Sequence, residues 1–218
     1  MTDKGLRVSA GGRADHHLAP GYRYRTHVPA FDDLANKDEW QDHVYAFARR
    51  TFDRHGFASV LDIGCGSGYK LVKHFGDIAR TGVDRAETVA LLRARHPEGD
   101  WLALEELGDR YPEADLYVCC DVVEHVPEPA AMLAMIARSR FRRLVISTPT
   151  REILVADGRR NPVGPPANEF HAMEWTMGEF HRLLSEYFDI ERHFFDYNGQ
   201  YTQIALCLPK TGDPEAVR

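Results

Sequence analysis

The chain has 218 residues, of which 44% are hydrophobic, and a formal net charge of −6. This length and apolar content suffice for one α/β domain with a full core and are too small for two. An acidic chain has no general attraction to nucleic acid or to anionic membranes, and no apolar run reaches the roughly 20 residues of a membrane span. The polar N-terminus lacks the apolar core of a signal peptide. We expect a cytoplasmic protein without nucleic-acid or membrane partners.

The four cysteines form no C-x-x-C pair, and two of them are adjacent inside an apolar run. Such cysteines are typical of reduced, buried thiols in a cytoplasmic protein. They are Cys65, Cys119, Cys120 and Cys207.

Residues 1–37 are polar and lack an apolar period, which predicts an N-terminal arm. Within it, Tyr22 to Arg25 alternates aromatic and basic residues, so a strand would place both tyrosines on one face. This arm is interpreted either as a lid over an active site or as a strand packed on the domain. A helix is predicted over 38–55, with Trp40, Val44 and Phe52 among the residues of its apolar stripe. Asp38 is its expected cap, and Gly56 ends it.

An apolar run over 58–63 predicts a buried strand, and a helix is predicted over 69–75. Three glycines at alternate positions separate the two, namely Gly64, Gly66 and Gly68. Glycine permits positive φ and leaves no side chain between the backbone and a ligand. The following helix N-terminus offers free N–H groups to a polar ligand.

The next strand, 80–84, ends in Asp84, about 20 residues after the glycine loop. An acid at this place can accept hydrogen bonds from both ribose hydroxyls of an adenosine in the neighbouring crevice. Asp84 alternatively caps the helix predicted over 86–95. A third strand is predicted over 100–104.

The fourth strand, 115–120, is apolar almost throughout, as is typical of a strand buried on both faces. A helix over 130–138 and a fifth strand over 142–147 follow. The order of strands and helices predicts a doubly wound α/β sheet that binds ligands at the carboxyl ends of its strands. Further along, the sequence indicates a long loop, a helix begun by Thr176 and Glu179, and a hairpin around Asn198-Gly199. Their ranges are 150–168 for the loop, 175–187 for the helix, and 189–196 and 201–208 for the hairpin strands.

The candidate catalytic and metal-binding residues directly follow the fourth strand. In one helical turn, Asp121, Glu124 and His125 would share a face, because they are three and four residues apart. Two carboxylates and an imidazole on one face can hold a divalent cation. His171 is the next candidate ligand, from the loop after the fifth strand.

The glycine loop, with Asp62 two residues before Gly64, resembles motif I of the class I S-adenosylmethionine (SAM) methyltransferases. The resemblance spans about residues 40–209 and implies a Rossmann-like, seven-stranded sheet ending in an antiparallel hairpin. It places Asp62 near the SAM amino group and Asp84 on the ribose. Glu105 is the best match for an adenine contact, with Asp100 and Glu106 as competitors. The implied cofactor-binding set is Asp62, Gly64, Cys65, Gly66, Gly68, Asp84, Glu105 and Cys120.

His171 stands three residues before Glu174-Trp175-Thr176, a spacing similar to that in the small-RNA 3′-terminal 2′-O-methyltransferases. That family carries Glu-x-x-Glu-His where this chain has Asp121, Glu124 and His125. The ubiquinone O-methyltransferases also have Glu-His at this place, with a metal implicated. Many other small-molecule methyltransferases carry Glu-His-Val there and bind no metal. Three hypotheses stay open: a Mg²⁺ or Mn²⁺ site, a metal-free base or orienting pair, and a structural role. The metal hypothesis uses Asp121, Glu124, His125 and His171, and the catalytic hypothesis uses His125, His171 and Glu124.

The domain is expected over 38–209, followed by a polar tail over 210–218. We expect methyl transfer from SAM to a hydroxyl oxygen of a small polyhydroxylated molecule, such as a sugar or a secondary metabolite. The alternatives are a metal-dependent RNA 3′-terminal 2′-O-methyltransferase and a SAM-binding protein without catalysis. The acidic charge argues against RNA.

Overall fold

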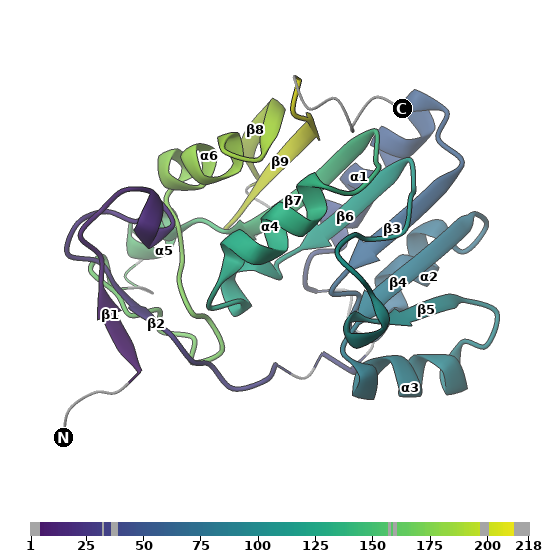
Figure 1. Ribbon diagram of the computed structural model, residues 1–218, viewed down its shortest axis with the longest axis horizontal. Helices are drawn as coiled ribbons and strands as arrows, with labels where there is room; N and C mark the ends of the chain where they lie inside the picture. The colour runs from purple at the N-terminus through teal and green to yellow at the C-terminus, as the bar shows by residue number, and fades with distance from the viewer. Residues whose placement is uncertain are drawn as a thin grey trace.

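The computed structural model describes residues 5–31, 33–35, 39–156, 158, 161–196 and 201–211. At its centre is a seven-stranded sheet in the order β5-β4-β3-β6-β7-β9-β8 (Figure 1). β5, β4, β3, β6 and β7 are parallel, and β9 is antiparallel to both of its neighbours. The predicted doubly wound α/β fold is confirmed. The strands are β3 (Ser59–Ile63), β4 (Ala79–Asp84), β5 (Asp100–Ala103), β6 (Leu116–Cys120), β7 (Arg143–Pro149), β8 (Phe188–Asp196) and β9 (Thr202–Pro209).

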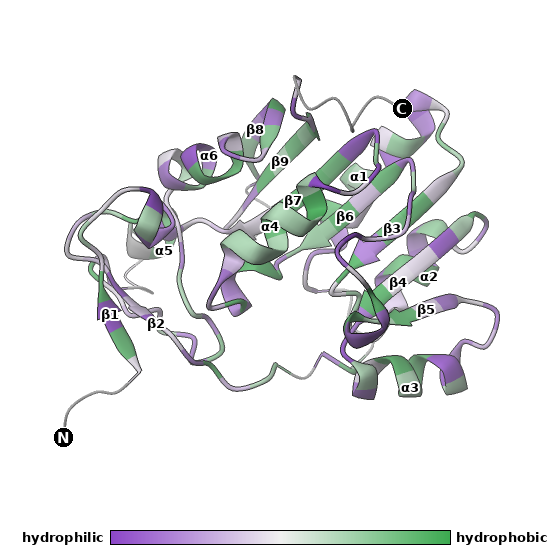
Figure 2. Ribbon diagram, in the orientation of Figure 1, coloured by the Kyte–Doolittle hydropathy of each residue, from purple (hydrophilic) through white to green (hydrophobic). Residues whose placement is uncertain are grey.

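Two apolar clusters cover the two faces of the sheet, and apolar residues run through its central strands (Figure 2). β6 contributes to both: Leu116 and Val118 pack in one cluster, Tyr117 and Cys119 in the other. This alternation follows from the two-residue period of a strand. One cluster includes side chains of α1 (Asp42–His55), α2 (Tyr69–Phe75) and α3 (Ala86–Arg95), and the other includes those of α4 (Pro129–Ala137) and α6 (Met177–Ser185).

The first helix is shorter than predicted. α1 begins at Asp42 with Gln41 as its N-cap, and the expected cap Asp38 lies outside the described residues. Trp40 precedes the helix and is 53% exposed, so its assignment to the apolar stripe was wrong. Gly56 ends the helix with φ of 62°, as predicted.

The predicted loop over 150–168 contains a short helix, α5 (Arg151–Ala156), so the expectation of an unstructured loop there was wrong. Arg151 N donates to the Trp175 carbonyl at 3.0 Å, which anchors the start of this helix. The capping box of α6 is confirmed, since Thr176 Oγ1 accepts from Glu179 N. The Asn198-Gly199 turn lies outside the described residues.

The N-terminal arm contains a two-stranded hairpin of β1 (Leu6–Val8) and β2 (Arg23–Arg25), with a 3₁₀ turn between them at Arg13–Asp15. Tyr22 and Tyr24 are buried in the apolar cluster of α4 and α6, as the alternation predicted. Arg25 donates hydrogen bonds to the carbonyls of Pro166, Asn168 and His171. The arm therefore packs on the domain and fixes the loop that carries His171.

All four cysteines are free and buried, as predicted. Within the described ranges, no helix combines the length and apolarity needed to cross a membrane.

Glu179 joins three parts of the chain in the interior. One carboxylate oxygen accepts from Arg151 Nη2 and from Ala19 N, each at 2.7 Å, and the other accepts from Thr176 N at 2.7 Å. Both partners of the Arg151–Glu179 ion pair are buried, with side chains 6% and 4% exposed. Breaking such a pair leaves a charge in the interior without compensation.

We predict that Glu179→Gln lowers the free energy of unfolding by roughly 3 kcal/mol. Glu186→Gln is the matched control, because Glu186 also pairs with the N-terminal arm, through exposed Arg13 and through His17, and its own side chain is 19% exposed. Glu186→Gln should lower the free energy of unfolding by less than about 1 kcal/mol. Urea unfolding measures both values, and equal losses would contradict the role of Glu179.

Candidate functional site

The glycine loop lies where the sheet order reverses, between the parallel neighbours β3 and β6. Gly64, Gly66 and Gly68 have φ values of 74°, 52° and 70°. A Cβ on Gly64 would lie 2.5 Å from a methyl carbon of Val122, so only glycine fits there. The loop thus brings its backbone against the segment after β6 at the crevice where α/β sheets bind ligands.

Asp84 ends β4 beside this loop. One of its carboxylate oxygens accepts from Gly66 N at 2.9 Å, and the other accepts from its neighbour Arg85 N at 2.8 Å. Asp84 thereby fixes the loop conformation while it lines the cavity described next.

A cavity of about 680 Å³ opens at the carboxyl ends of the strands. Its walls come from the glycine loop, the ends of β4 and β6, α4 and a cover segment, which we define as residues 26–31 and 33. Arg85 donates to the Phe31 carbonyl at 3.0 Å. A Cβ on Gly66 would lie 2.9 Å from a carboxylate oxygen of Asp33, so the cover segment lies directly over the glycine loop.

Asp62 lies beneath the loop and is fully buried. One oxygen accepts from the Tyr45 hydroxyl at 2.7 Å, and the other has no partner among the described residues. Burial raises the pKa of the Asp62 carboxyl to about 7. A buried oxygen without a partner indicates a missing polar group or charge close by.

The cavity brings together most of the predicted cofactor-binding residues. Asp62 lies beneath it, and Gly68 packs against Leu92 and Trp101 instead of lining it. Glu105 does not line it either: it accepts from Ala86 N at 3.2 Å, whereas its neighbour Leu104 forms part of the wall. The other five predicted residues do line the cavity, namely Gly64, Cys65, Gly66, Asp84 and Cys120.

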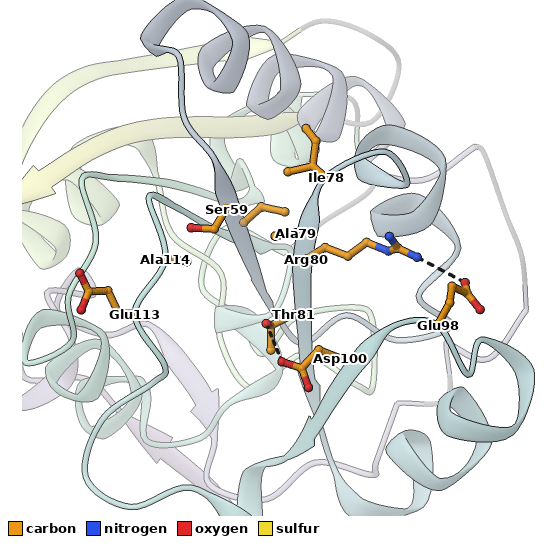
Figure 3. Close-up of a pocket in the computed structure, with 10 residues that line it drawn as sticks. Ser59, Ile78, Ala79, Arg80, Thr81, Glu98, Asp100, Glu113 and Ala114 are labelled. Carbon is orange, nitrogen blue, oxygen red and sulfur yellow. Dashed lines mark hydrogen bonds and ion pairs between the residues drawn. The ribbon is translucent and has the colours of Figure 1, made fainter.

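A second cavity of about 300 Å³ lies at the other end of the strands (Figure 3). Asp100 is on its wall and accepts from Thr81 Oγ1 at 3.1 Å, while Arg80 pairs with Glu98. Asp100 is therefore at the opposite edge of the sheet from the glycine loop, which removes it as a competitor of Glu105.

Glu124, His125 and His171 form a cluster beside the larger cavity, which His125 lines, with one ligand atom of each within 4.8 Å of the others. Glu124 is 1% exposed; one oxygen accepts from Thr148 Oγ1 at 3.0 Å, and the other has no partner among the described residues. Burial, with the nearby Asp121, raises the pKa of Glu124 well above its usual range.

His125 connects the cluster to the cavity, which it lines. Its Nδ1 donates to the Phe170 carbonyl at 2.9 Å, which leaves Nε2 with its lone pair. Its ring stacks on Phe31 of the cover segment at 5.0 Å and meets His171 edge-on at 4.8 Å. Burial, reinforced by His171, lowers the pKa of His125 to about 4, so the ring is neutral at neutral pH.

Two neighbours fix the orientation of His171. Its Nδ1 donates to a carboxylate oxygen of Glu174 at 2.7 Å, and its Nε2 accepts from Asn168 Nδ2 at 2.9 Å. The sequence pattern contained Glu174 without a role for it, and it offered no signal for Asn168 or for Thr148.

Asp121 does not join this cluster. The 3₁₀ helix after β6 spans Val123–His125, and Asp121 precedes it with φ of 50°. Its carboxylate accepts from Ser147 Oγ at 2.5 Å on the neighbouring strand β7. The expectation that Asp121, Glu124 and His125 share one helical face was wrong, because the helix begins two residues later than that arrangement requires.

A family model described as a methyltransferase domain matches residues 29–192. A protein of Mycolicibacterium smegmatis named as a probable S-adenosylmethionine-dependent methyltransferase is 33% identical over 162 residues, which cover 69% of this chain and 59% of that protein. A ubiquinone biosynthesis O-methyltransferase of Idiomarina loihiensis is 35% identical over 91 residues, 37% of each chain. This chain thus spans less than two thirds of the length of these relatives.

Solved structures share the fold at low identity. Magnesium protoporphyrin IX methyltransferase from Synechocystis, with bound S-adenosylhomocysteine (SAH), superposes with a TM-score of 0.57 at 19% identity, covering 78% of this chain and 84% of that one. The methyltransferase domain of a bacterial Hen1 gives 0.58 at 19% identity, covering 77% and 98%. The family match, the switch-point glycine loop and the shared fold lead to one conclusion: the chain belongs to the class I SAM-dependent methyltransferases.

Proposed function

We propose that the protein transfers the methyl group of SAM to a hydroxyl oxygen of a small molecule held beside His125. The observation that carries this proposal is the Glu124–His125–His171 cluster, whose member His125 lines the cavity of about 680 Å³. We assign this cavity to SAM and call it the donor cavity. It presents an unprotonated Nε2 on His125 and a carboxylate oxygen of Glu124 without a partner among the described residues. The similarity to ubiquinone biosynthesis O-methyltransferases supports oxygen as the acceptor atom.

The wall beside His125 supports an acceptor with an apolar body. Val28 and Phe31 of the cover segment, Val126, and Met132 of α4 line the same cavity as His125, and Phe31 stacks on the His125 ring. A sugar needs many hydrogen-bonding partners when it leaves water, and these side chains offer none. Within the expected class of hydroxylated molecules, the lining therefore favours a secondary metabolite over a sugar.

Methyl transfer mainly requires alignment. SAM supplies a methyl group on a sulfonium, which is a good leaving group, so the enzyme must hold an oxygen in line with that methyl. His125 Nε2 can accept a hydrogen bond from the acceptor hydroxyl and orient it. A pKa near 4 makes His125 too weak a base to remove the proton before transfer, so it first orients the hydroxyl. As the O–C bond forms and the C–S bond breaks, the oxygen becomes acidic, its proton passes to His125 Nε2, and SAH leaves.

The cluster also fits a divalent cation. One carboxylate and two imidazoles suit Mn²⁺, Fe²⁺ or Zn²⁺ better than Mg²⁺, which prefers oxygen ligands. Glu124, His125 and His171 would hold it, after Asn168 has moved from His171 Nε2. A bound cation would lower the pKa of an acceptor hydroxyl.

A second candidate is methylation of an RNA 3′-terminal 2′-hydroxyl. The spacing of His171 to Glu174-Trp175-Thr176 and the same cluster favour it. The net charge of −6 argues against it, because RNA binding depends on cationic contacts to phosphates. A third candidate is SAM binding without catalysis, which gives the Glu124–His125–His171 cluster no function.

For the donor, we propose that Asp84 accepts hydrogen bonds from the ribose hydroxyls. Asp84→Ala should weaken SAH binding at least about 100-fold, because two hydrogen bonds to a charged group are lost. Asp100→Ala, at the opposite edge of the sheet, is the control and should bind normally. Calorimetry measures both affinities, and unchanged binding by folded Asp84→Ala would refute the ribose assignment.

A pH dependence follows if Asp62 lies near the donor amino group. Below about pH 7 the donor-free protein keeps a proton on Asp62. The positive amino group favours the carboxylate, so binding releases that proton, and SAH affinity should fall by up to about tenfold per pH unit from 7 to 5. Calorimetry in buffers of different ionisation enthalpy counts the released proton. Asp62→Asn should show no such release; release of the same size in both proteins would contradict the assignment.

For the acceptor, His125→Ala and His171→Ala should each lower turnover by about 10²- to 10⁴-fold while SAH affinity is retained. The reason is that His125 lines the cavity where we propose that the acceptor binds, and His171 packs edge-on against the His125 ring and positions it. His181→Ala, which removes an exposed histidine of α6, is the matched control.

The assay uses SAM with phenols, catechols, sugars and short RNA 3′ ends, each with added Mn²⁺ and after treatment with EDTA. Loss of activity in EDTA would assign the cluster to a cation. Full activity in both histidine variants would refute the proposed function, and transfer to RNA alone would establish the second candidate.

A further inference from the structure

The loop before His171 depends on the N-terminal arm for the partners of its backbone. Residues 161–171, all of them described by the structure, form no helix or strand, and they include three prolines, which have no N–H group to donate. The carbonyls of such a segment need donors from elsewhere in the chain. Arg25 supplies them: Nη2 donates to the Pro166 carbonyl at 2.9 Å, and Nη1 donates to the carbonyls of Asn168 and His171 at 3.1 and 2.9 Å.

These carbonyls belong to the backbone that orients both rings of the acceptor cluster. Between Asn168 and His171, the Phe170 carbonyl accepts from His125 Nδ1 at 2.9 Å, which leaves Nε2 of that ring for the cavity. Asn168 Nδ2 donates to His171 Nε2 at 2.9 Å. A shift of this backbone would therefore turn the His125 ring and move His171 with it.

The main chain of Arg25 leads to the third member of the cluster. Arg25 N donates to the Ala172 carbonyl at 2.8 Å, and Ala172 N donates to the Glu124 carbonyl at 2.7 Å. The cover segment begins at the next residue, Thr26. Arg25 thus lies where the arm, the loop and the cover segment meet.

The donor half of the site is held by other contacts. Asp84 accepts from Gly66 N, and Asp62 accepts from the Tyr45 hydroxyl. In the part of the chain that the structure describes, Arg25 does not line the donor cavity. Removal of its guanidinium should therefore disturb the acceptor half of the site and leave the donor half in place.

We propose that Arg25 is a positioning residue for methyl transfer, which holds the backbone of 166–171 so that His125 Nε2 faces the acceptor hydroxyl. This inference rests on the proposed function, because it assigns Arg25 to the acceptor half of that site. A misplacement of reacting groups by roughly 1 Å can cost about 100-fold in rate. Arg25 therefore sets the turnover and not the donor affinity.

The first test compares turnover with donor affinity. Arg25→Met should lower kcat by about 10- to 100-fold with an acceptor found in the screen above, while SAH affinity changes by less than about threefold. Arg25→Lys should retain part of the turnover, because an ammonium group lacks the planar fork that reaches separate carbonyls. An equal loss of turnover and of SAH affinity in Arg25→Met would mean a general structural role and would overturn the proposal.

Arg23→Met is the matched control. Arg23 belongs to the same arm and donates from Nε and Nη2 to the Gly164 carbonyl, earlier in the same loop, at 3.1 and 2.8 Å. Its kcat should stay within about threefold of the wild-type value, because the backbone around Phe170 keeps its partners. A loss as large as that of Arg25→Met would overturn the proposal.

The second test needs no acceptor. In NMR spectra of the SAH complex, the ring C–H signals of His125 and His171 are assigned from their alanine variants. Arg25→Met should shift or broaden these two signals and leave that of exposed His181 unchanged, whereas Arg23→Met should alter none of the three. If Arg25→Met fails to fold, Arg25→Lys gives the same measurements.

The two tests separate this inference from the proposed function. Unchanged signals of His125 and His171 in the Arg25 variants would refute the role of Arg25 alone. Full activity of His125→Ala would refute the proposed function itself, and with it the need to position that ring.

Discussion

The parallel pairing of β3 with β6 is the constraint on which the site depends. Because both strands end at the same edge, the glycine loop after β3 and the segment after β6 meet there. Gly64 accepts Val122 at a distance that no side chain would permit. This contact places the cavity of about 680 Å³ next to the turn that carries Glu124 and His125. The pairing of β6 with β7 then brings Thr148 within hydrogen-bonding distance of Glu124.

The sheet was predictable from sequence because buried parallel strands leave a strong local signal. The run over 115–120 became β6, and the helices over 69–75 and 86–95 were predicted with their observed bounds. The errors lie where tertiary contacts override local pattern. Trp40 has the right spacing for the α1 stripe but precedes the helix, and α5 is anchored by a hydrogen bond to Trp175, far away in sequence.

The site was predictable in its residue types and less so in its geometry. The three glycines and Asp84 could be assigned to a ligand site from the sequence, because ligands of α/β sheets bind at the carboxyl ends of the strands. Asp121 was misplaced because it is itself left-handed, with φ of 50°, and so lies outside the 3₁₀ helix that begins at Val123; local sequence does not predict that conformation for an Asp. The partners that orient His171 come from its own loop, which Arg25 of the N-terminal arm holds in place through long-range hydrogen bonds. Sequence spacing contains no information on such contacts.

The proposed function requires donor and acceptor to meet between the glycine loop and the Glu124–His125–His171 cluster. A crystal structure of the SAH complex tests it most directly. We predict that the SAH sulfur faces His125 Nε2, with room between them for one acceptor oxygen roughly 3–3.5 Å from the methyl position. A sulfur that points away from the cluster, or one separated from it by protein side chains, would contradict the account.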